Sequence, residues 1–317
     1  MATIDTNPTS KPHVESDETM ASNVYLRIKP NAKAEANRGV YTVLGSTTLR
    51  VKKGKTVDKR YSFARIFDSN ATQADLFHQC VRRRVIRFLL GESSTILTYG
   101  AFNTGKTYTL YGTPDSPGVI ARAIEFLFST VNCTLTPWYK VTDDDSVVPL
   151  DERQRATEIH GRASLLNAKT TAGEEFAQAR LSLSNSKPRV AALEERELWS
   201  DECMTSVWIS VVEVRNDSVY DLLASDEEER RPPLKVTARK DGSARVNGLK
   251  LVHVITALEA CQLLMLARSR MTVAASNSRS HTFFTFKLLK YEKENAPEDV
   301  RVSTLTFCDV AGSRRLK

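Results

Sequence analysis

Residues 100–107, which read GAFNTGKT, place a lysine and a threonine directly after the second of two glycines. The pattern G-x-x-x-x-G-K-[ST] is typical of a loop whose backbone N–H groups surround phosphate oxygens, because glycine lets the backbone approach the ligand closely. Lys106 would bring a positive charge to the outer phosphates, and the hydroxyl of Thr107 would bind Mg²⁺. The segment therefore predicts a binding site for a nucleoside triphosphate.

Two later segments carry other side chains that such a site needs. Residues 276–281, SNSRSH, place hydroxyl groups and an arginine before an expected strand, although alone they are equally typical of a polar loop. Residues 308–312, CDVAG, place Asp309 at the end of an apolar strand, three residues before Gly312. In phosphate-loop enzymes an aspartate there holds Mg²⁺, and the glycine N–H senses the γ-phosphate. The three segments in this order strengthen the prediction of a triphosphate site.

The residues between these segments predict intermixed strands and helices that would position them. Residues 94–100, STILTYG, are interpreted as a buried strand before the loop, and a helix is expected to begin near Lys106. The preceding helix is expected to end at Gly91, a typical capping residue. The fold class predicted is α/β: a three-layer phosphate-loop NTPase with a central, mostly β sheet flanked by helices, incomplete at its C-terminus. Other expected strands are 23–30, 206–214, 246–254, 281–291 and 302–310, with helices at 119–131 and 257–276.

Composition narrows the class of protein. The chain has 317 residues, of which 41% are hydrophobic and 26% charged, and it has no apolar run long enough to cross a membrane. Five scattered cysteines without a C-x-x-C pair suit neither a zinc site nor a disulfide framework, and they favour a reducing, intracellular compartment. The net charge of +7 is a weak sign of a polyanionic partner. The densest basic segments are 230–235 and 81–88, and the second is interpreted as the solvated face of an amphipathic helix rather than a nucleic-acid site.

Two stretches differ in character from the rest of the chain. Residues 1–22 are polar and mixed in charge, without the apolar core of a secretory signal, so we expect a disordered N-terminal tail. Residues 132–205 are polar and only weakly helical in pieces. This second stretch is interpreted as a long insertion, at best partly ordered, within a domain that spans residues 23–317.

The chain resembles a kinesin motor domain over residues 23–131 and 206–317. Its phosphate loop is similar to the kinesin form, which begins Gly-Gln-Thr and ends Gly-Lys-Thr. VYLRIKP resembles the first kinesin strand, whose R-x-R-P packs against adenine, and YSFARIFDSNATQADLF and SVVEVRNDSVYDLL resemble two further kinesin stretches. SRSH is similar to the end of switch I and DVAGS to the start of switch II. The long insertion, with TPWYKV and SLLN, resembles the mitotic-kinesin-like class of spindle midzones and cytokinesis.

The resemblance implies roles for individual residues. Arg27 and Pro30 would flank adenine, with Lys29 in place of the usual arginine, and Tyr108 would lie near the base. Ser278 would join Thr107 and Asp309 at Mg²⁺, and the catalytic set would be Ser278, Arg279, Asp309 and Gly312. The nucleotide-binding set would be Arg27, Pro30, Gly100, Ala101, Phe102, Asn103, Thr104, Gly105, Lys106, Thr107 and Tyr108.

The switch segments depart from the kinesin pattern in ways that bear on turnover. Switch I has Ala274 where kinesins have asparagine and Asn277 where they have serine, and its approach is a few residues short. Switch II has Arg314 in place of a glutamate that pairs with the switch I arginine, here Arg279. Two guanidinium groups would repel each other, and losing a buried ion-pair partner costs about 3–5 kcal/mol. The milder alternative is an Arg314 side chain that points to solvent. The chain also stops at Lys317, before the kinesin helices that make most of the microtubule contact.

Two functions therefore remain open from the sequence. The first is an ATP-binding microtubule motor that couples Mg·ATP hydrolysis to movement, in the cytoplasm on the cytoskeleton and at the spindle. The second is a truncated or degenerate kinesin-like module that holds nucleotide without productive hydrolysis. ATP and Mg²⁺ are the expected cofactors and microtubules the expected partner, with no nucleic acid and no membrane. The sequence shows no coiled-coil heptads, so dimerisation is not expected to be encoded in this chain.

Overall fold

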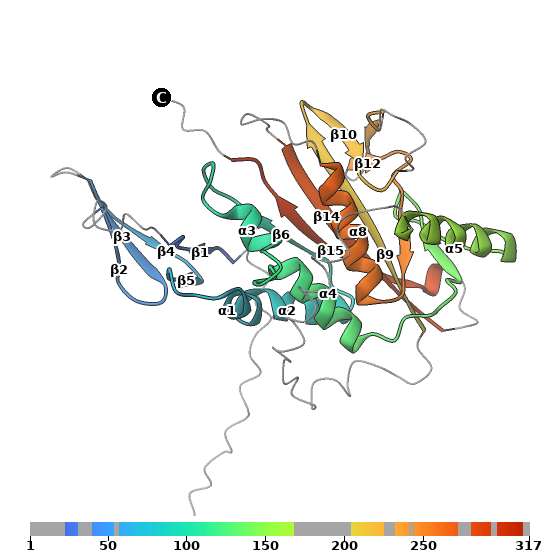
Figure 1. Cartoon of the computed structure of the whole chain (residues 1–317), viewed down its shortest axis with the longest axis horizontal. Coiled ribbons are helices and arrows are strands. Elements are labelled where there is room, and N and C mark those ends of the chain that lie inside the picture. Colours follow the sequence, from blue (N-terminus) through green and yellow to red (C-terminus); the bar gives the residue numbers. More distant parts are fainter. Residues whose placement is uncertain are drawn as a thin grey trace, which may run out of the picture. The chain divides into compact units, whose positions relative to one another are not determined.

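The computed structural model describes residues 23–30, 40–53, 57–167, 204–224, 232–240, 242, 244–271, 280–292 and 297–312 (Figure 1). The chain divides into two compact units, Met1–Asn70 and Ala71–Lys317, which are described one at a time. The tail predicted for residues 1–22 lies outside the described residues, as does the second half of the predicted insertion, 168–203.

The first unit consists of two small sheets. Strand β1 (Tyr25–Arg27) pairs in parallel with β5 (Arg65–Phe67). Strands β2 (Tyr41–Val43), β3 (Thr48–Lys53) and β4 (Val57–Ser62) form an antiparallel meander. The two sheets are joined by backbone hydrogen bonds such as Ile66 N to Ser46 O, at 2.6 Å. The strand predicted before Pro30 and the β-rich region after it are both present.

The second unit begins with a helical segment that changes its pitch. Helix α1 (Gln73–Leu76) begins at a capping box in which the Thr72 hydroxyl accepts from the backbone N–H of Asp75 and the Asp75 carboxylate accepts from the backbone N–H of Thr72. A π-helical turn, η2 (Phe77–Val81), follows, and α2 (Arg82–Leu89) completes the segment. Gly91, beyond its end, has φ +101°, which favours glycine. The predicted helix and its capping glycine are confirmed.

A mixed sheet forms the centre of the second unit, with the strand order β10-β9-β14-β15-β6 and β13 also paired with β9. Strands β9 (Met204–Arg215), β14 (Ser280–Tyr291) and β15 (Arg301–Asp309) run antiparallel to one another in this order, whereas β6 (Ser94–Thr98) runs parallel to β15. The remaining strands are β10 (Ser218–Asp221) and β13 (Val252–Val254). This register brings the ends of β6 and β15 and the start of β14 to one edge, where Thr98 and Thr282 both pair with Asp309.

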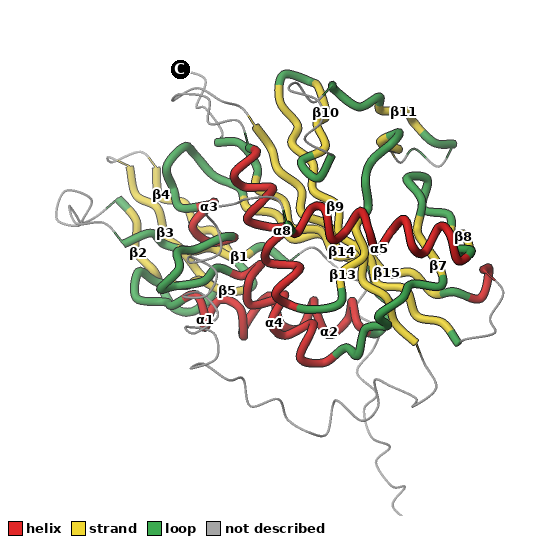
Figure 2. Tube along the Cα trace, turned by 45° about the vertical axis from the view of Figure 1, so that its right-hand side comes forward, coloured by secondary structure: helices red, strands yellow, loops and turns green. Residues whose placement is uncertain are grey.

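Helices pack against this sheet. Helix α2 touches β15, where the Ser303 hydroxyl donates to the Phe88 carbonyl at 2.8 Å. Helix α3 (Lys106–Leu110) follows the phosphate loop and contacts β6 and β15, and α4 (Val119–Thr130) packs between α2 and α8 (Ala257–Arg270). Figures 1 and 2 show α4 and α8 side by side. The α/β fold predicted from the sequence, a central sheet flanked by helices, is confirmed.

The first half of the predicted insertion is built into the second unit. Strands β7 (Tyr139–Val141) and β8 (Val147–Pro149) form a hairpin, and α5 (Glu152–Leu166) begins at a capping box made by Asp151 and Gln154. The hairpin packs on the sheet through a cluster of buried side chains, and α5 contacts β13 and α8. The cluster consists of Tyr139, Val141, Leu150, Trp208, Leu251, Leu289, Tyr291 and Val300.

The prediction that residues 94–100 form a buried strand is wrong with respect to burial. Strand β6 is present, but its residues alternate between half-buried and exposed, and Leu97 is 59% exposed. Among the described strands β6 pairs only with β15, so it is the last strand of its sheet. A run of apolar and β-branched residues predicts a strand, but its position in the sheet depends on partners far away in the sequence.

Candidate nucleotide-binding site

The phosphate loop connects the end of β6 to the start of α3. Gly105 immediately precedes α3 with φ +95°, and Gly100 opens the loop with φ +151°; glycine adopts both without the steric cost of a Cβ. Asn103 also has a positive φ, at +59°, a conformation that asparagine tolerates better than most residues. The Thr104 hydroxyl donates to the Ala101 carbonyl at 2.9 Å and closes the loop on itself. The predicted sequence of strand, loop and helix is therefore present.

Lys106 folds back across the loop that it follows. Its Nζ donates to the carbonyl oxygens of Gly100, at 3.0 Å, and Ala101, at 2.7 Å. These contacts hold the ammonium group at the loop, where a phosphate group could replace the carbonyl oxygens as its hydrogen-bond partner. The ammonium group of Lys106 therefore lies at the loop, and its predicted contact with the outer phosphates stays a prediction.

Asp309 connects the end of β15 to the phosphate loop. The Thr107 hydroxyl donates to Asp309 Oδ2 at 2.7 Å, and the Thr98 hydroxyl lies 3.4 Å from Oδ1. Asp309 is only 9% exposed, and this burial raises the pKa of its carboxyl group, against the lowering effects of the Thr107 hydrogen bond and the Lys106 charge. The carboxylate is therefore a poorly solvated anion, whose charged form a cation bound beside it would stabilise.

Gly312 lies against the backbone of the phosphate loop. A Cβ at position 312 would stand 2.9 Å from both the N and the Cα atoms of Phe102, closer than real side chains approach. Phe102 occupies a position where the kinesin loop has threonine, and its side chain is 76% exposed. The glycine thus allows the segment after β15 to reach the loop directly, so a shift of either segment would move the other.

A hydrogen bond joins the SRSH motif to the segment that follows Asp309. His281, the last residue of the SRSH motif, lies in β14, and its Nδ1 accepts a hydrogen bond from the Ala311 backbone N–H at 3.2 Å. This bond requires Nδ1 to be unprotonated, which fixes the tautomer of the neutral ring. Next to it, the Ser280 hydroxyl donates to the buried carboxylate of Glu213 in β9. The start of β14 is therefore tied both to the segment after Asp309 and to β9.

Some of the residues named from the sequence are not brought to this site by the described structure. Ser278, Arg279 and Arg314 lie outside the described residues, together with Ala274 and Asn277, and their roles stay predictions. Arg27 lies in β1 and Pro30 follows it, both in the first unit, so their contact with adenine also stays a prediction.

Tyr108 belongs to the second unit, on α3. It is 43% exposed, and its hydroxyl lies 3.4 Å from the Ser116 hydroxyl. An exposed aromatic side chain one residue after Thr107 is available to a ligand at the loop. Its predicted place near a nucleotide base stays a prediction.

The sequence did not identify several residues that the structure brings to the site. Thr98 could have been found, because a hydroxyl at the end of the strand before the loop stands opposite Asp309 if the two strands are parallel neighbours. Nothing in the sequence pattern indicated the packing of Arg268 on Tyr111, with the guanidinium carbon 4.9 Å from the ring centroid. This contact connects the end of α8, which leads toward switch I, to the end of α3.

The side chains at the end of the phosphate loop are suited to bind a complex of Mg²⁺ with a nucleotide. Thr107 and Asp309 offer two oxygen ligands close together, and Mg²⁺ is usually held by one or two such groups together with phosphate oxygens and water. No group of three or more histidine, cysteine or acidic residues that could hold a metal without a nucleotide occurs among the residues described. The described helices also include none that is both long and apolar enough to span a bilayer.

A Gly-Lys-Thr loop between a strand and a helix, with an aspartate from a neighbouring strand on its threonine, defines the phosphate-loop class of nucleotide-binding domains. The family is shown by sequence comparison. The profile of the family described as "Kinesin motor domain" matches residues 23–317, and the chain belongs to this family.

Individual relatives agree with the predicted resemblance to mitotic kinesin-like proteins. The chain is 29% identical to human kinesin-like protein KIF20B over 92% of its own length and 18% of that protein. It is 28% identical to bovine kinesin-like protein KIF20A, covering 99% of this chain and 42% of that one. The Drosophila melanogaster kinesin-like protein subito is 31% identical, with 92% and 48% covered. The chain thus spans less than half the length of these curated relatives.

Solved structures share the fold. A structure described as "kinesin 6" superposes with a TM-score of 0.70 at 22% identity, covering 92% of this chain and 76% of that one. A second, described as "Structure of a fast kinesin: Implications for ATPase mechanism and interactions with microtubules", superposes with a TM-score of 0.62 at 22% identity, covering 93% and 66%. Both superpositions support the kinesin motor fold for this chain.

Proposed function

We propose that this chain binds Mg·ATP at its phosphate loop and acts as the motor domain of a microtubule motor of the cytoskeleton and spindle. Its membership of the kinesin motor-domain family supports the proposal. The single observation that carries it is the Thr107–Asp309 contact, because it joins the first turn of α3, directly after the phosphate loop, to the end of β15, where a magnesium ion would bind. One of the structurally similar proteins, the fast kinesin, is described by its ATPase mechanism and its interactions with microtubules.

The residues of the site would divide the work of phosphoryl transfer. Lys106 would exchange the carbonyl oxygens of Gly100 and Ala101 for phosphate oxygens. Thr107 and Asp309 would hold the magnesium ion, which neutralises charge that develops on the phosphates. Gly312 would transmit the presence of the outer phosphate, because it touches the loop backbone at Phe102. Catalysis by such a site consists of positioning and charge stabilisation.

Binding of a fluorescent ATP analogue with Mg²⁺, and again with EDTA, tests the first part of this proposal. We expect Thr107→Ala to remove most of the Mg²⁺-dependent affinity, a loss of about tenfold to hundredfold. Thr109→Ala is the matched control: this threonine lies in the same helix, and its hydroxyl donates to the Gly105 carbonyl. Equal losses in the two variants, or affinity that does not depend on Mg²⁺, would contradict the proposed site.

Steady-state ATP hydrolysis with and without microtubules tests the second part. Stimulation by microtubules is the result expected of a motor domain, whereas nucleotide binding without stimulation would support the module that holds nucleotide without turnover. Arg314 is the sequence feature that motivates this alternative. If repulsion between Arg314 and Arg279 limits hydrolysis, Arg314→Glu should raise the rate; no gain would shift the cause to switch I.

A further inference from the structure

Tyr111 stands directly after α3, the helix that begins with Lys106 and Thr107. It is only 7% exposed, and its backbone N–H donates to the carbonyl oxygen of Thr107 at 2.9 Å. Burial, followed by the charge of Asp309, raises the pKa of its hydroxyl group, so the side chain lies within electrostatic reach of the carboxylate that ends β15. Tyr111 is therefore bonded to one expected magnesium ligand and lies close to the other.

Helix α3 is too short to hold its own position. It has five residues, and Gly105, at its N-terminal capping position, offers no side chain to cap it. An isolated helix of this length is not stable in water, so contacts with the rest of the domain must fix it. Leu110, at 1% exposure, anchors one side of the helix. Tyr111 anchors its end, so a contact that holds the ring of Tyr111 also holds the last turn of α3.

Arg268, in the last turn of α8, packs on the ring of Tyr111. Its guanidinium carbon lies 4.9 Å from the ring centroid, within the range of a cation–π contact. Arg268 is itself exposed, whereas the tyrosine that it contacts is buried. The charge of Arg268 lowers the pKa of Tyr111, against the larger effects of burial and Asp309. The contact thus joins α8 to the residue that follows α3.

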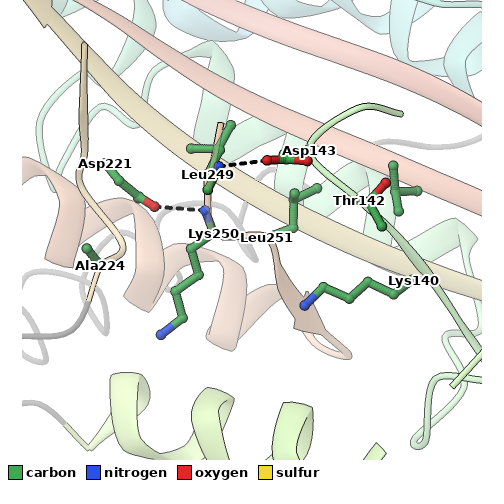
Figure 3. A pocket seen from close by; sticks show the side chains of 10 residues that line it. Lys140, Thr142, Asp143, Asp221, Ala224, Leu249, Lys250 and Leu251 are labelled. Carbon is green, nitrogen blue, oxygen red and sulfur yellow. Dashed lines mark hydrogen bonds between the residues drawn. The ribbon is translucent and has the colours of Figure 1, made fainter. Parts of the chain in front are cut away.

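The end of α8 that carries Arg268 is fixed by other contacts. Arg270 donates to two carbonyl oxygens of the segment after β10, both at 3.0 Å. Asp221 holds that segment in turn, because its carboxylate accepts hydrogen bonds from the backbone N–H groups of Leu223, at 2.7 Å, and Lys250, at 2.8 Å. Figure 3 shows the Asp221 carboxylate directed toward the Lys250 backbone. Arg268 therefore extends from a helix end that is itself held in place.

We propose that Arg268 is a positioning residue for magnesium binding at the phosphate loop. It acts through Tyr111: the cation–π contact holds the last turn of α3, and the hydrogen bond from the Tyr111 backbone passes this constraint to Thr107. Because α8 leads in the sequence to the SRSH motif, the same contact links the position of that helix to a magnesium ligand. This role rests on the function proposed above, since it requires Mg²⁺ and a nucleotide at the loop.

Titration of Mg²⁺ at a saturating concentration of a fluorescent ATP analogue measures this role on the full chain. We expect Arg268→Gln to raise the apparent Kd for Mg²⁺ about twofold to fivefold, the size of a cation–π contact at an exposed site. Affinity for the analogue in EDTA should stay unchanged, because the variant leaves the hydrogen bonds within the loop in place. Arg268→Lys keeps a cation over the ring and should recover most of the affinity for Mg²⁺.

Substitutions of Tyr111 test the route through its ring. Tyr111→Phe keeps the aromatic face and should bind Mg²⁺ like the wild type, whereas Tyr111→Leu should lose at least as much affinity as Arg268→Gln. Added to Tyr111→Leu, Arg268→Gln should cause no further loss, because its partner is already gone. Equal losses from Arg268→Gln in the two backgrounds would overturn the proposal. If Tyr111→Leu does not fold, Tyr111→Phe and the two variants of the exposed Arg268 still decide the matter.

A matched cation–π contact elsewhere separates positioning from general stability. Arg155 of α5 packs over Trp138 in the insertion, with its guanidinium carbon 4.5 Å from the ring centroid. Arg155→Gln should lower the free energy of unfolding in denaturant about as much as Arg268→Gln does, and it should leave the Kd for Mg²⁺ unchanged. A Kd that rises equally in both variants would assign the effect to lost stability or lost positive charge and would overturn the proposal.

The wild-type chain distinguishes a failure of this inference from a failure of the proposed function. A wild type that binds the analogue without any dependence on Mg²⁺ would contradict the function proposed above, and the role of Arg268 with it. Affinity that depends on Mg²⁺ in the wild type, together with an unchanged Kd in Arg268→Gln, would retain the proposed function and overturn the role of Arg268 alone.

Discussion

Asp309 at the nucleotide site lies in a different environment from Asp143 and Asp145, two aspartates of the turn between β7 and β8. Asp309 is buried and contacts two threonine hydroxyls and a histidine-bearing strand, so the pKa of its carboxyl group is raised, with burial as the main cause. Asp143 and Asp145 are paired with arginine and lysine side chains, and their pKa values are lowered. The first environment keeps an anion in need of a cation, whereas the second has already supplied the cations. Asp309 is therefore the carboxylate that a bound cation would stabilise, whereas Asp143 and Asp145 are already paired with cationic side chains of the protein.

Removing the charge of Asp309 should give the largest effect, because it removes the anion that awaits a cation. We expect Asp309→Asn to lower ATP turnover by about 10²- to 10³-fold, since asparagine can still bond to Thr107 but brings no negative charge to Mg²⁺. Measurements of turnover against Mg²⁺ concentration check this. Asp143→Asn serves as the comparison and should leave turnover without microtubules unchanged; a similar loss in both would remove the distinction between the two regions.

A methyl group at position 312 tests the backbone contact at the phosphate loop. Gly312→Ala places a Cβ 2.9 Å from the Phe102 backbone, and such overpacking costs about 1–3 kcal/mol, which should appear as weaker nucleotide binding measured by titration. In α5, a Cβ at Gly161 would meet no atom within 4 Å, so Gly161→Ala should instead stabilise the fold by about 0.5–1 kcal/mol in denaturant unfolding. Unchanged nucleotide binding by Gly312→Ala would contradict the close contact between Gly312 and the Phe102 backbone. Unchanged stability of Gly161→Ala would contradict the expected gain in α5.

The contact between α5 and β13 should lose stability at a higher pH than the turn that contains Asp143 and Asp145, because those two carboxylates have lowered pKa values and lose their contribution only as the pH falls below the ordinary value of 3.8. His253 packs near Trp208, and burial, followed by the charge of Arg162, lowers its pKa from 6.5 to about 3. Between those values the unfolded chain binds a proton that the folded chain does not. The contribution of His253 to the free energy of unfolding is therefore fully present above pH 6.5. About 1.4 kcal/mol of it is lost for each pH unit between pH 6.5 and about 3.

Denaturant unfolding at several pH values measures this slope. His253→Gln should flatten it, whereas His160→Gln, which changes an exposed histidine of α5, should leave it in place. A slope that persists in His253→Gln would assign the effect to other groups. A slope that is flattened equally by both substitutions would show that burial at β13 is not its cause.

Local signals in the sequence were sufficient for part of the fold and of the site. The capping Gly91 after α2, the glycines of the phosphate loop and the strand at residues 281–291 depend on residue types within a short stretch of sequence, which is why they could be predicted. The position of β6 at the end of the sheet could not be predicted, because β15, its only partner among the described strands, lies more than two hundred residues away in the sequence. The contacts of the Asp143–Asp145 turn are equally hard to predict, because their partners are distant in the chain and a polar, charge-mixed stretch gives no periodicity from which to infer them.

Residue type and spacing were enough to predict that Lys106 and Thr107 end a phosphate loop and that Asp309 ends a strand. The folded arrangement was needed to show that Thr107 donates to Asp309, that Gly312 lies against the Phe102 backbone, and that Asp143 and Asp145 accept hydrogen bonds from Arg245 and Arg239. Such contacts join segments that are distant in the chain, and their geometry is fixed by strand register and packing rather than by any local preference of the residues involved.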